Sequence, residues 1–116
     1  MTVEEYLAGK NEHAVEMFRR FAALVDACGE SEVVPHASIV YWRRTRVWAG
    51  AFIQSRRLEL NVDLLREAEH PLCLSVFPTT KRVYTHRLRI TELEQLDGSI
   101  AALLAEAYAD VGPGTR

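Results

Sequence analysis

The 116-residue sequence has few cysteines and no long apolar run. Cys28 and Cys73 both fall in apolar surroundings, so they fit reduced, packed thiols better than a disulfide framework. No apolar stretch is long enough to cross a bilayer, and the first five residues lack the basic start and apolar core of a signal peptide. We therefore expect a cytoplasmic protein that does not contact a membrane.

Motifs that identify common classes of enzyme are also missing. The sequence contains no nucleophile elbow, no glycine-rich phosphate-binding loop and no HExxH zinc motif. His70 and Cys73 could bind a metal together with His36 or His86, but a structural zinc site needs a complete tetrahedral set of ligands and the usual paired motif is absent. We therefore expect no metal and no cofactor, and the sequence favours a non-enzymatic protein over an enzyme.

The composition is that of an ordinary globular domain. Hydrophobic residues make up 48% and charged residues 26% of the chain, which are usual shares for a globular protein. A chain of this length is enough for one domain with a substantial core. We expect a single domain over residues 1–111 and a flexible tail over residues 112–116, because glycine and proline follow the last predicted helix.

The most regular pattern in the chain lies in residues 57–64. Apolar side chains alternate there with polar ones, and a period of two places the two sets on opposite faces of a strand. The pattern predicts a half-buried strand in an antiparallel sheet with one wet face. The apolar set is Leu58, Leu60, Val62 and Leu64, and the polar set is Arg57, Glu59, Asn61 and Asp63.

The preceding residues predict a hairpin. Residues 39–42 and 47–53 are rich in β-branched and aromatic side chains, which favour strands. The polar residues 43–46 between them are typical of a hairpin tip. Further strands are predicted over residues 32–35, 72–77 and 82–90, and in the last of these Tyr84, His86, Leu88 and Ile90 share one face.

Helices are predicted at both ends of the chain. A capping box at Thr2 and Glu5 begins a short helix, and Asn11 caps a longer amphipathic one that ends at Gly29. A third helix, capped by Asp97 or Ser99, carries an apolar stripe from Ile100 to Val111. These elements predict an α+β fold, in which the N- and C-terminal helices pack on one face of a five- to six-stranded, mostly antiparallel sheet.

Charge is unevenly distributed along the chain. Residues 36–89, which hold most of the predicted strands, carry ten basic and four acidic residues, whereas the whole chain has a net charge of −2. A basic sheet between acidic helices could face an anion. Alternatively, long arginine side chains cover the wet face of the sheet and pair with acidic residues.

Aromatic and basic residues of the strands form the candidate site. Aromatic rings beside guanidinium groups suit a planar or anionic small molecule, while the net acidic charge argues against nucleic acid. The alternative is that the aromatic rings belong to the core, the arginines are solvated and His86 is a hydrogen-bonded buried histidine. The candidate ligand-binding residues are Tyr41, Arg43, Arg46, Trp48, Tyr84, His86 and Arg89.

Two functions follow from this site. Helices on one face leave the other sheet face open, and Trp42 and Trp48 on that face would form an apolar patch of the kind that mediates self-association. We therefore expect a binding or interaction module that forms a homodimer through the open sheet face. The alternative is a small enzyme or carrier for an anionic molecule, in which His86 is the acid–base group and Arg43, Arg46 or Arg89 holds the anion.

Five segments together resemble the bacterial family catalogued as domain of unknown function 5655. The resemblance lies in the order and spacing of short motifs along nearly the whole chain, and it implies the same α+β fold. His86 and Arg89 match positions that this family also fills with His and Arg. The segments are residues 2–10 (TVEEYLAGK), the helix end at Cys28-Gly29, residues 38–44 (SIVYWRR), residues 85–91 (THRLRIT) and residues 104–108 (LAEAY).

The resemblance has one departure and one more distant link. The family commonly shows His-Pro-Arg-Lys before the third strand, where this chain has Phe52, Ile53, Gln54 and Ser55. A function carried by that basic loop in relatives is therefore not expected here. The family is also loosely similar to small iron-chaperone-like domains of the same general shape, and it implies no established activity.

Overall fold

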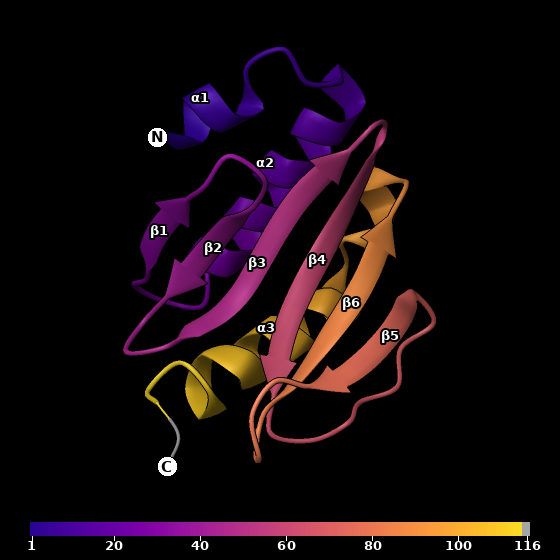
Figure 1. Cartoon of the computed structure of the whole chain (residues 1–116). Coiled ribbons are helices and arrows are strands. Elements are labelled where there is room, and N and C mark those ends of the chain that lie inside the picture. Colours follow the sequence, from indigo (N-terminus) through magenta and orange to yellow (C-terminus); the bar gives the residue numbers. More distant parts are fainter. Residues whose placement is uncertain (115–116) are drawn as a thin grey trace.

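A six-stranded antiparallel sheet forms the centre of the computed structural model, which describes residues 1–114 (Figure 1). The strands lie in the order β1-β2-β3-β4-β6-β5, so β6 inserts between β4 and the edge strand β5. Their bounds are β1 (Glu32–Pro35), β2 (Val40–Arg43), β3 (Val47–Gln54), β4 (Arg57–Leu64), β5 (Cys73–Pro78) and β6 (Tyr84–Ile90). The predicted strands are confirmed, with ends that differ by one or two residues.

The long helices cover one face of this sheet, and Figure 1 shows both of them behind the strands. They are α2 (Glu12–Asp26) and α3 (Gly98–Asp110), joined by the short α1 (Val3–Leu7) at the N-terminus and a 3₁₀ turn, η1 (Leu93–Gln95). Each α-helix begins at a side-chain cap that accepts backbone N–H groups. The cap of α3 is Asp97 rather than Ser99, and the predicted α+β fold is confirmed.

The core lies between the helices and the sheet. Leu58, Leu60, Val62 and Leu64 of β4 are fully buried there, as their alternation predicts. Met17, Phe18 and Phe21 of α2 are buried against the same layer. The apolar stripe of α2 therefore packs on the apolar face of the sheet, and the burial of this area is the main stabilising contribution.

Trp42 and Trp48 belong to this core and not to the open face of the sheet. Trp42 packs against Phe18 and Phe21, with ring centroids 5.9 and 5.5 Å apart. Trp48 is the extra residue of a bulge in β3, because Trp42 pairs with Ala49 while Arg43 pairs with Val47. The bulge turns its ring towards α3, where it lies 5.3 Å from Tyr108. The expected apolar patch of tryptophans on the open face is therefore wrong.

The chain beyond α3 is held at the β2–β3 turn. Gly112 is buried, and its carbonyl accepts backbone hydrogen bonds from Thr45 and Arg46. Gly112, the first residue of the expected flexible tail, is thus held in place. Residues 115–116 of that tail lie outside the described residues. Within residues 1–114, no helix is both long and apolar enough to cross a membrane.

Candidate functional site

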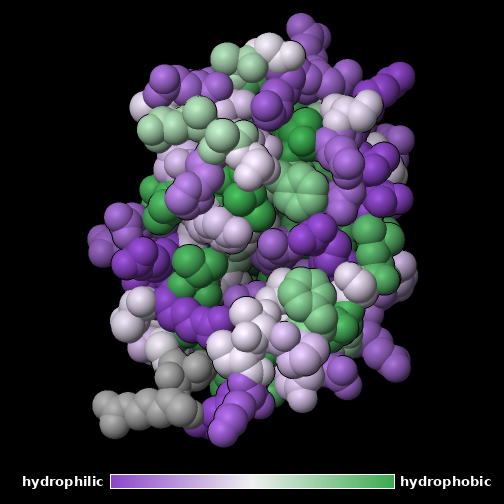
Figure 2. Space-filling model, in the orientation of Figure 1, coloured by the Kyte–Doolittle hydropathy of each residue, from purple (hydrophilic) through white to green (hydrophobic). Residues whose placement is uncertain are grey.

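The sheet face that points away from the helices, called here the open face, is polar and rich in arginine. On β4 it carries Arg57, Glu59, Asn61 and Asp63, and pairing places Arg89, Arg87 and Thr85 of β6 opposite the last three. Figure 2 looks onto this face, where hydrophilic and hydrophobic side chains are interspersed and no continuous apolar patch appears. The open face therefore presents charge and hydrogen-bonding groups rather than an apolar surface.

Three arginines converge on one buried carboxylate at the centre of the open face. Glu59 is only 4% exposed. Its Oε2 lies 3.1 Å from Nε of Arg57 and 3.4 Å from Nη2 of Arg89, and its Oε1 lies 3.7 Å from Nη1 of Arg87. We call Arg57, Arg87 and Arg89 the arginine cluster. Three guanidinium charges against one carboxylate leave a local excess of positive charge.

The arginine cluster is held in place by its neighbours. Arg87 donates from Nε to Asn61 Oδ1 at 2.7 Å, and its guanidinium lies over the Phe52 ring, 4.9 Å from the centroid. Arg57 donates from Nη2 to Gln54. Nε of Arg89 is buried and has no hydrogen-bond partner among residues 1–114. An unsatisfied buried donor costs free energy. Here the unsatisfied donor belongs to Arg89, which is a member of the arginine cluster.

A hollow of about 400 Å³ opens on the same face beside the arginine cluster. Asn61 lines it and also accepts the hydrogen bond from Arg87, so the two features are contiguous. Its volume lies within the usual range for small-molecule sites, and such sites combine apolar walls with a few polar groups. Its lining includes Tyr41, Arg46, Val47, Asn61, Asp63, Phe77, Thr79 and Thr85.

Asp63 is the buried charge of this hollow. It is 7% exposed, and its Oδ1 accepts a 2.8 Å hydrogen bond from the Thr85 hydroxyl, which is itself hydrogen-bonded to Thr79. Its Oδ2 lies 3.6 Å from Nη2 of Arg46, which is beyond hydrogen-bond distance. Burial raises the pKa of the Asp63 carboxyl, against the opposing effects of the Thr85 hydrogen bond and the Arg46 charge.

The structure separates the sequence-predicted site residues into two groups. Tyr41, Arg43, Arg46 and Arg89 lie on the open face, where Tyr41 and Arg46 line the hollow and Arg89 belongs to the arginine cluster. Arg43 lies away from both, near the corner of the sheet, with Nε 4.0 Å from Glu32 Oε1. Trp48, Tyr84 and His86 lie on the helix side of the sheet.

His86 has a structural position. It is 2% exposed and pairs with Val62 on the helix side of the sheet. Its Nε2 accepts a hydrogen bond from the backbone N–H of Ala68 at 2.8 Å, and its Nδ1 lies 3.2 Å from the carbonyl oxygen of Val62. Nδ1 therefore carries the proton and donates to Val62. With both ring nitrogens bound to backbone, His86 does not reach the open-face arginines.

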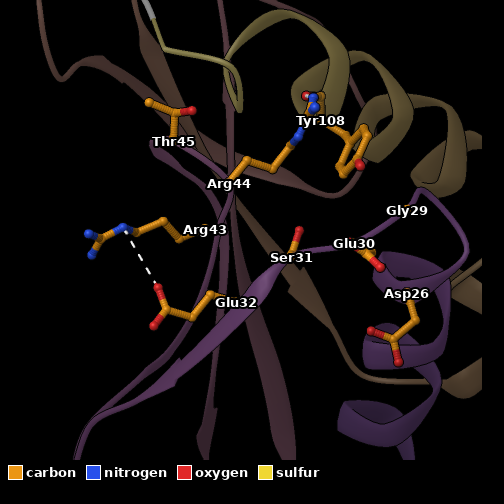
Figure 3. Close-up of a pocket in the computed structure, with 9 residues that line it drawn as sticks. All are labelled: Asp26, Gly29, Glu30, Ser31, Glu32, Arg43, Arg44, Thr45 and Tyr108. Atoms are coloured by element: carbon orange, nitrogen blue, oxygen red, sulfur yellow. Dashed lines mark hydrogen bonds and ion pairs between the residues drawn. The ribbon is translucent and has the colours of Figure 1, made fainter.

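Two other hollows have less to offer a ligand. One of about 960 Å³ lies where β1, the β2–β3 turn and α3 meet (Figure 3). Arg43 there faces Glu32, and Arg44 lies toward Tyr108, with its guanidinium 4.1 Å from the ring centroid. Its charged side chains, Asp26, Glu30, Glu32, Arg43 and Arg44, are all exposed. The arrangement is a wide corner flanked by the Arg43–Glu32 ion pair and by the contact of Arg44 with Tyr108.

The other hollow, of about 460 Å³, lies beside η1 and the start of α3. Ser99 Oγ donates to Asp97 at 2.6 Å and lies 2.8 Å from His70 Nε2, while His70 Nδ1 accepts from the Leu72 N–H. The His70 proton is therefore on Nε2, so this ring cannot take a proton from Ser99 and does not activate it. Among residues 1–114, no three His, Cys, Asp or Glu side chains form a metal-binding group.

Several residues of the open-face site were missed by sequence reasoning. Alternation along β4 placed Glu59 and Asp63 on the wet face, and a wet face implies exposed carboxylates. Both are instead buried, Glu59 among the arginine cluster and Asp63 beside Arg46 and Thr85. The sequence does contain a signal: Glu59 and Asp63 are two acidic residues four positions apart on a strand that faces several arginines. Recognising that signal requires knowing that β6 lies beside β4.

Comparison with known proteins gives one match. A family model described as Domain of unknown function (DUF5655) matches residues 3–111, nearly the whole chain. No curated protein matches the chain. No solved structure matches it either.

Proposed function

The chain belongs to the family described as Domain of unknown function (DUF5655), and we propose that this member is a binding module whose open face holds a small anionic molecule. One observation carries the proposal. Three arginines surround a single buried carboxylate, so the cluster keeps an excess of positive charge after its internal contacts are made. A carboxylate or phosphate group would balance that charge.

The arginine cluster has unused donors for such a group. Arg57 and Arg87 each use Nε and one terminal nitrogen in the contacts above, and Arg89 uses Nη2. Each guanidinium group keeps terminal N–H groups that these contacts do not use, and the three side chains are each about one-third exposed. Planar guanidinium groups bind carboxylate and phosphate in forked geometry. Contacts to Asn61, Phe52 and Gln54 fix the guanidinium groups in advance, which reduces the entropy lost on binding.

The adjacent hollow accommodates the rest of the ligand. Val47, Tyr41 and Phe77 supply apolar and aromatic surface there, and Asn61 joins the hollow to the arginine cluster. The ligand is therefore a small organic anion rather than a bare inorganic ion. The runner-up from the sequence, an enzyme with His86 as its acid–base group, receives no support from a ring whose nitrogens both bind backbone groups.

Self-association through the open face and a bacterial cytoplasmic location remain proposals. Five large apolar side chains are exposed among residues 1–114, and they come from different parts of the chain: Met1, Val33, Leu65, Leu74 and Phe77. Phe77 is placed on the open face by its pairing with Thr85. Dimerisation and ligand binding would compete for the same surface, and the ligand has the stronger support from the charge of that surface.

Calorimetric titration with citrate and with inorganic phosphate tests the proposal. We expect both anions to bind, and the double variant Arg87→Gln/Arg89→Gln to bind citrate about tenfold or more weakly, because charge-assisted hydrogen bonds are lost. Arg66→Gln is the control, since Arg66 pairs with Glu106 of α3 and lies outside the open face. If Arg66→Gln weakens citrate binding equally, the loss of affinity comes from the change in net charge and not from the arginine cluster. If neither anion binds to the unmodified protein, the proposal is refuted.

A further inference from the structure

The hollow beside the arginine cluster contains a buried carboxylate that an anion alone does not explain. Asp63 lies at the hollow with its side chain 10% exposed. A purely anionic ligand would be repelled by this group. A carboxylate at an anion site therefore indicates that the ligand also carries positive charge or a strong hydrogen-bond donor.

The two oxygens of Asp63 have different surroundings. Oδ1 is held by the Thr85 hydroxyl, with Thr79 behind it. Oδ2 lies 3.6 Å from Nη2 of Arg46, so the pair is close enough to be attracted but does not form a hydrogen bond. The Thr85 bond fixes the orientation of the carboxylate and leaves Oδ2 able to accept one from a ligand.

Arg46 and Asp63 together form a neighbouring pair of opposite charges inside a cavity. Arg46 is 22% exposed in its side chain, and Tyr41, Val47 and Phe77 line the cavity with it. A zwitterion with adjacent ammonium and carboxylate groups matches such a pair, because its ammonium meets Asp63 and its carboxylate meets Arg46. An apolar or aromatic substituent of the ligand then packs against Phe77 and Tyr41.

From this juxtaposition we infer that the open-face ligand is an α-amino-acid-like zwitterion. Its ammonium group lies on Asp63 Oδ2, and its carboxylate lies on Arg46. The inference rests on the proposed function, since it assigns the class of ligand to the same site. Burial raises the pKa of the Asp63 carboxyl, and a bound ammonium group would offset that effect by stabilising the charged form.

Matched probes test the inference. Phenylalanine and 3-phenylpropanoate share one carbon skeleton and differ in the amine, so their affinities for the unmodified protein isolate the contribution of the ammonium group. We expect phenylalanine to bind about tenfold or more tightly, the usual effect of a hydrogen bond between charged groups. In Asp63→Asn this preference disappears, while the affinity for 3-phenylpropanoate is unchanged or higher.

The fold of Asp63→Asn must be verified, and two further variants, Arg46→Gln and Arg66→Gln, serve as comparisons. The side-chain amide oxygen introduced by Asp63→Asn can still accept the Thr85 hydrogen bond, so we expect this variant to fold, which its thermal unfolding transition verifies. Arg46→Gln weakens binding of both probes, and Arg66→Gln weakens neither. Equal affinity of the two probes, or equal weakening of both by Asp63→Asn, would overturn the inference while citrate binding upholds the proposed function. Failure of citrate, phosphate and both probes to bind would remove the proposed function and the inference together.

Discussion

At the scale of single residues, the open face depends on two buried carboxylates that are stabilised in different ways. Glu59 is surrounded by three guanidinium groups, whereas Asp63 has one hydroxyl hydrogen bond and one longer ion pair. Glu59 therefore organises its neighbours, since each arginine of the cluster is positioned by it. Asp63 is held in orientation but is incompletely compensated.

Replacement of Glu59 is predicted to destabilise the fold. In Glu59→Gln the three arginines lose their common counter-charge and repel one another, so the free energy of unfolding falls by about 1–3 kcal/mol. Urea unfolding at neutral pH measures this change. Glu92→Gln, an exposed carboxylate, is the matched control and should alter stability little. Equal stability of Glu59→Gln and the unmodified protein would show that the arginine cluster does not depend on Glu59.

Replacement of Asp63 is predicted to act in the opposite direction. Burial raises the pKa of Asp63 in the folded state, so its contribution to stability is present below the unfolded pKa and is lost as pH rises through the folded pKa. Asp63→Asn removes the cost of the buried charge at neutral pH and keeps the Thr85 hydrogen bond. We expect Asp63→Asn to be the more stable protein at neutral pH, with the difference shrinking as the pH falls through the raised folded-state pKa of Asp63 towards the ordinary aspartate pKa.

Urea unfolding of both proteins across this pH range checks the sign. An Asp63→Asn variant less stable than the unmodified protein at neutral pH would mean that the ion pair with Arg46 outweighs the cost of burial. Residues that lower the stability of the fold are common in functional sites.

At the scale of elements, alternation predicted the strand faces well and the irregular positions poorly. The prediction that Tyr84, His86, Leu88 and Ile90 share one face is confirmed, because period two alone determines it, and that face is the helix side of the sheet. Trp48 was assigned to the wrong face because an extra residue in β3 reverses the alternation locally. The tip at residues 43–46 contains no glycine or asparagine, so no turn chemistry in the sequence marked that bulge.

The segment between β4 and β5 is predicted to depend on His86. Its ring joins the Ala68 N–H to the Val62 carbonyl, so His86→Leu removes the ring nitrogen that accepts from the buried Ala68 N–H. We expect a loss of about 1–3 kcal/mol in the free energy of unfolding and faster hydrogen exchange at the Ala68 amide. His36→Leu, at an exposed position, is the control. An unchanged exchange rate at Ala68 in His86→Leu would contradict this role.

At the scale of the whole molecule, the sequence predicted the architecture but not the strand order. Consecutive strands are usually neighbours, yet β6 rather than β5 pairs with β4. That order brings Arg87 and Arg89 beside Asn61 and Glu59, and so creates the arginine cluster. The candidate site could therefore not be assembled from the sequence, because its members come together only through a long-range pairing that local patterns do not encode.

Native mass spectrometry of the purified protein, followed by denaturation of the same sample, addresses both the ligand and self-association. The proposed function predicts an added small-molecule mass that disappears on denaturation and is reduced in Arg87→Gln/Arg89→Gln. A homodimer without added mass that is disrupted by substitutions on the open face would instead support the interaction module expected from the sequence.

A ¹⁵N-resolved NMR titration with citrate shows whether the open face binds an anion and which residues contact it. We predict that the largest shift changes occur at the backbone amides of β4 and β6 around Glu59, Asn61, Arg87 and Arg89, and at the Nε–H signals of the arginine cluster. Nε of Arg89, unpartnered within residues 1–114, should respond strongly. Shift changes confined to the helices or to the corner at Arg43, or none at all, would contradict anion binding at the open face.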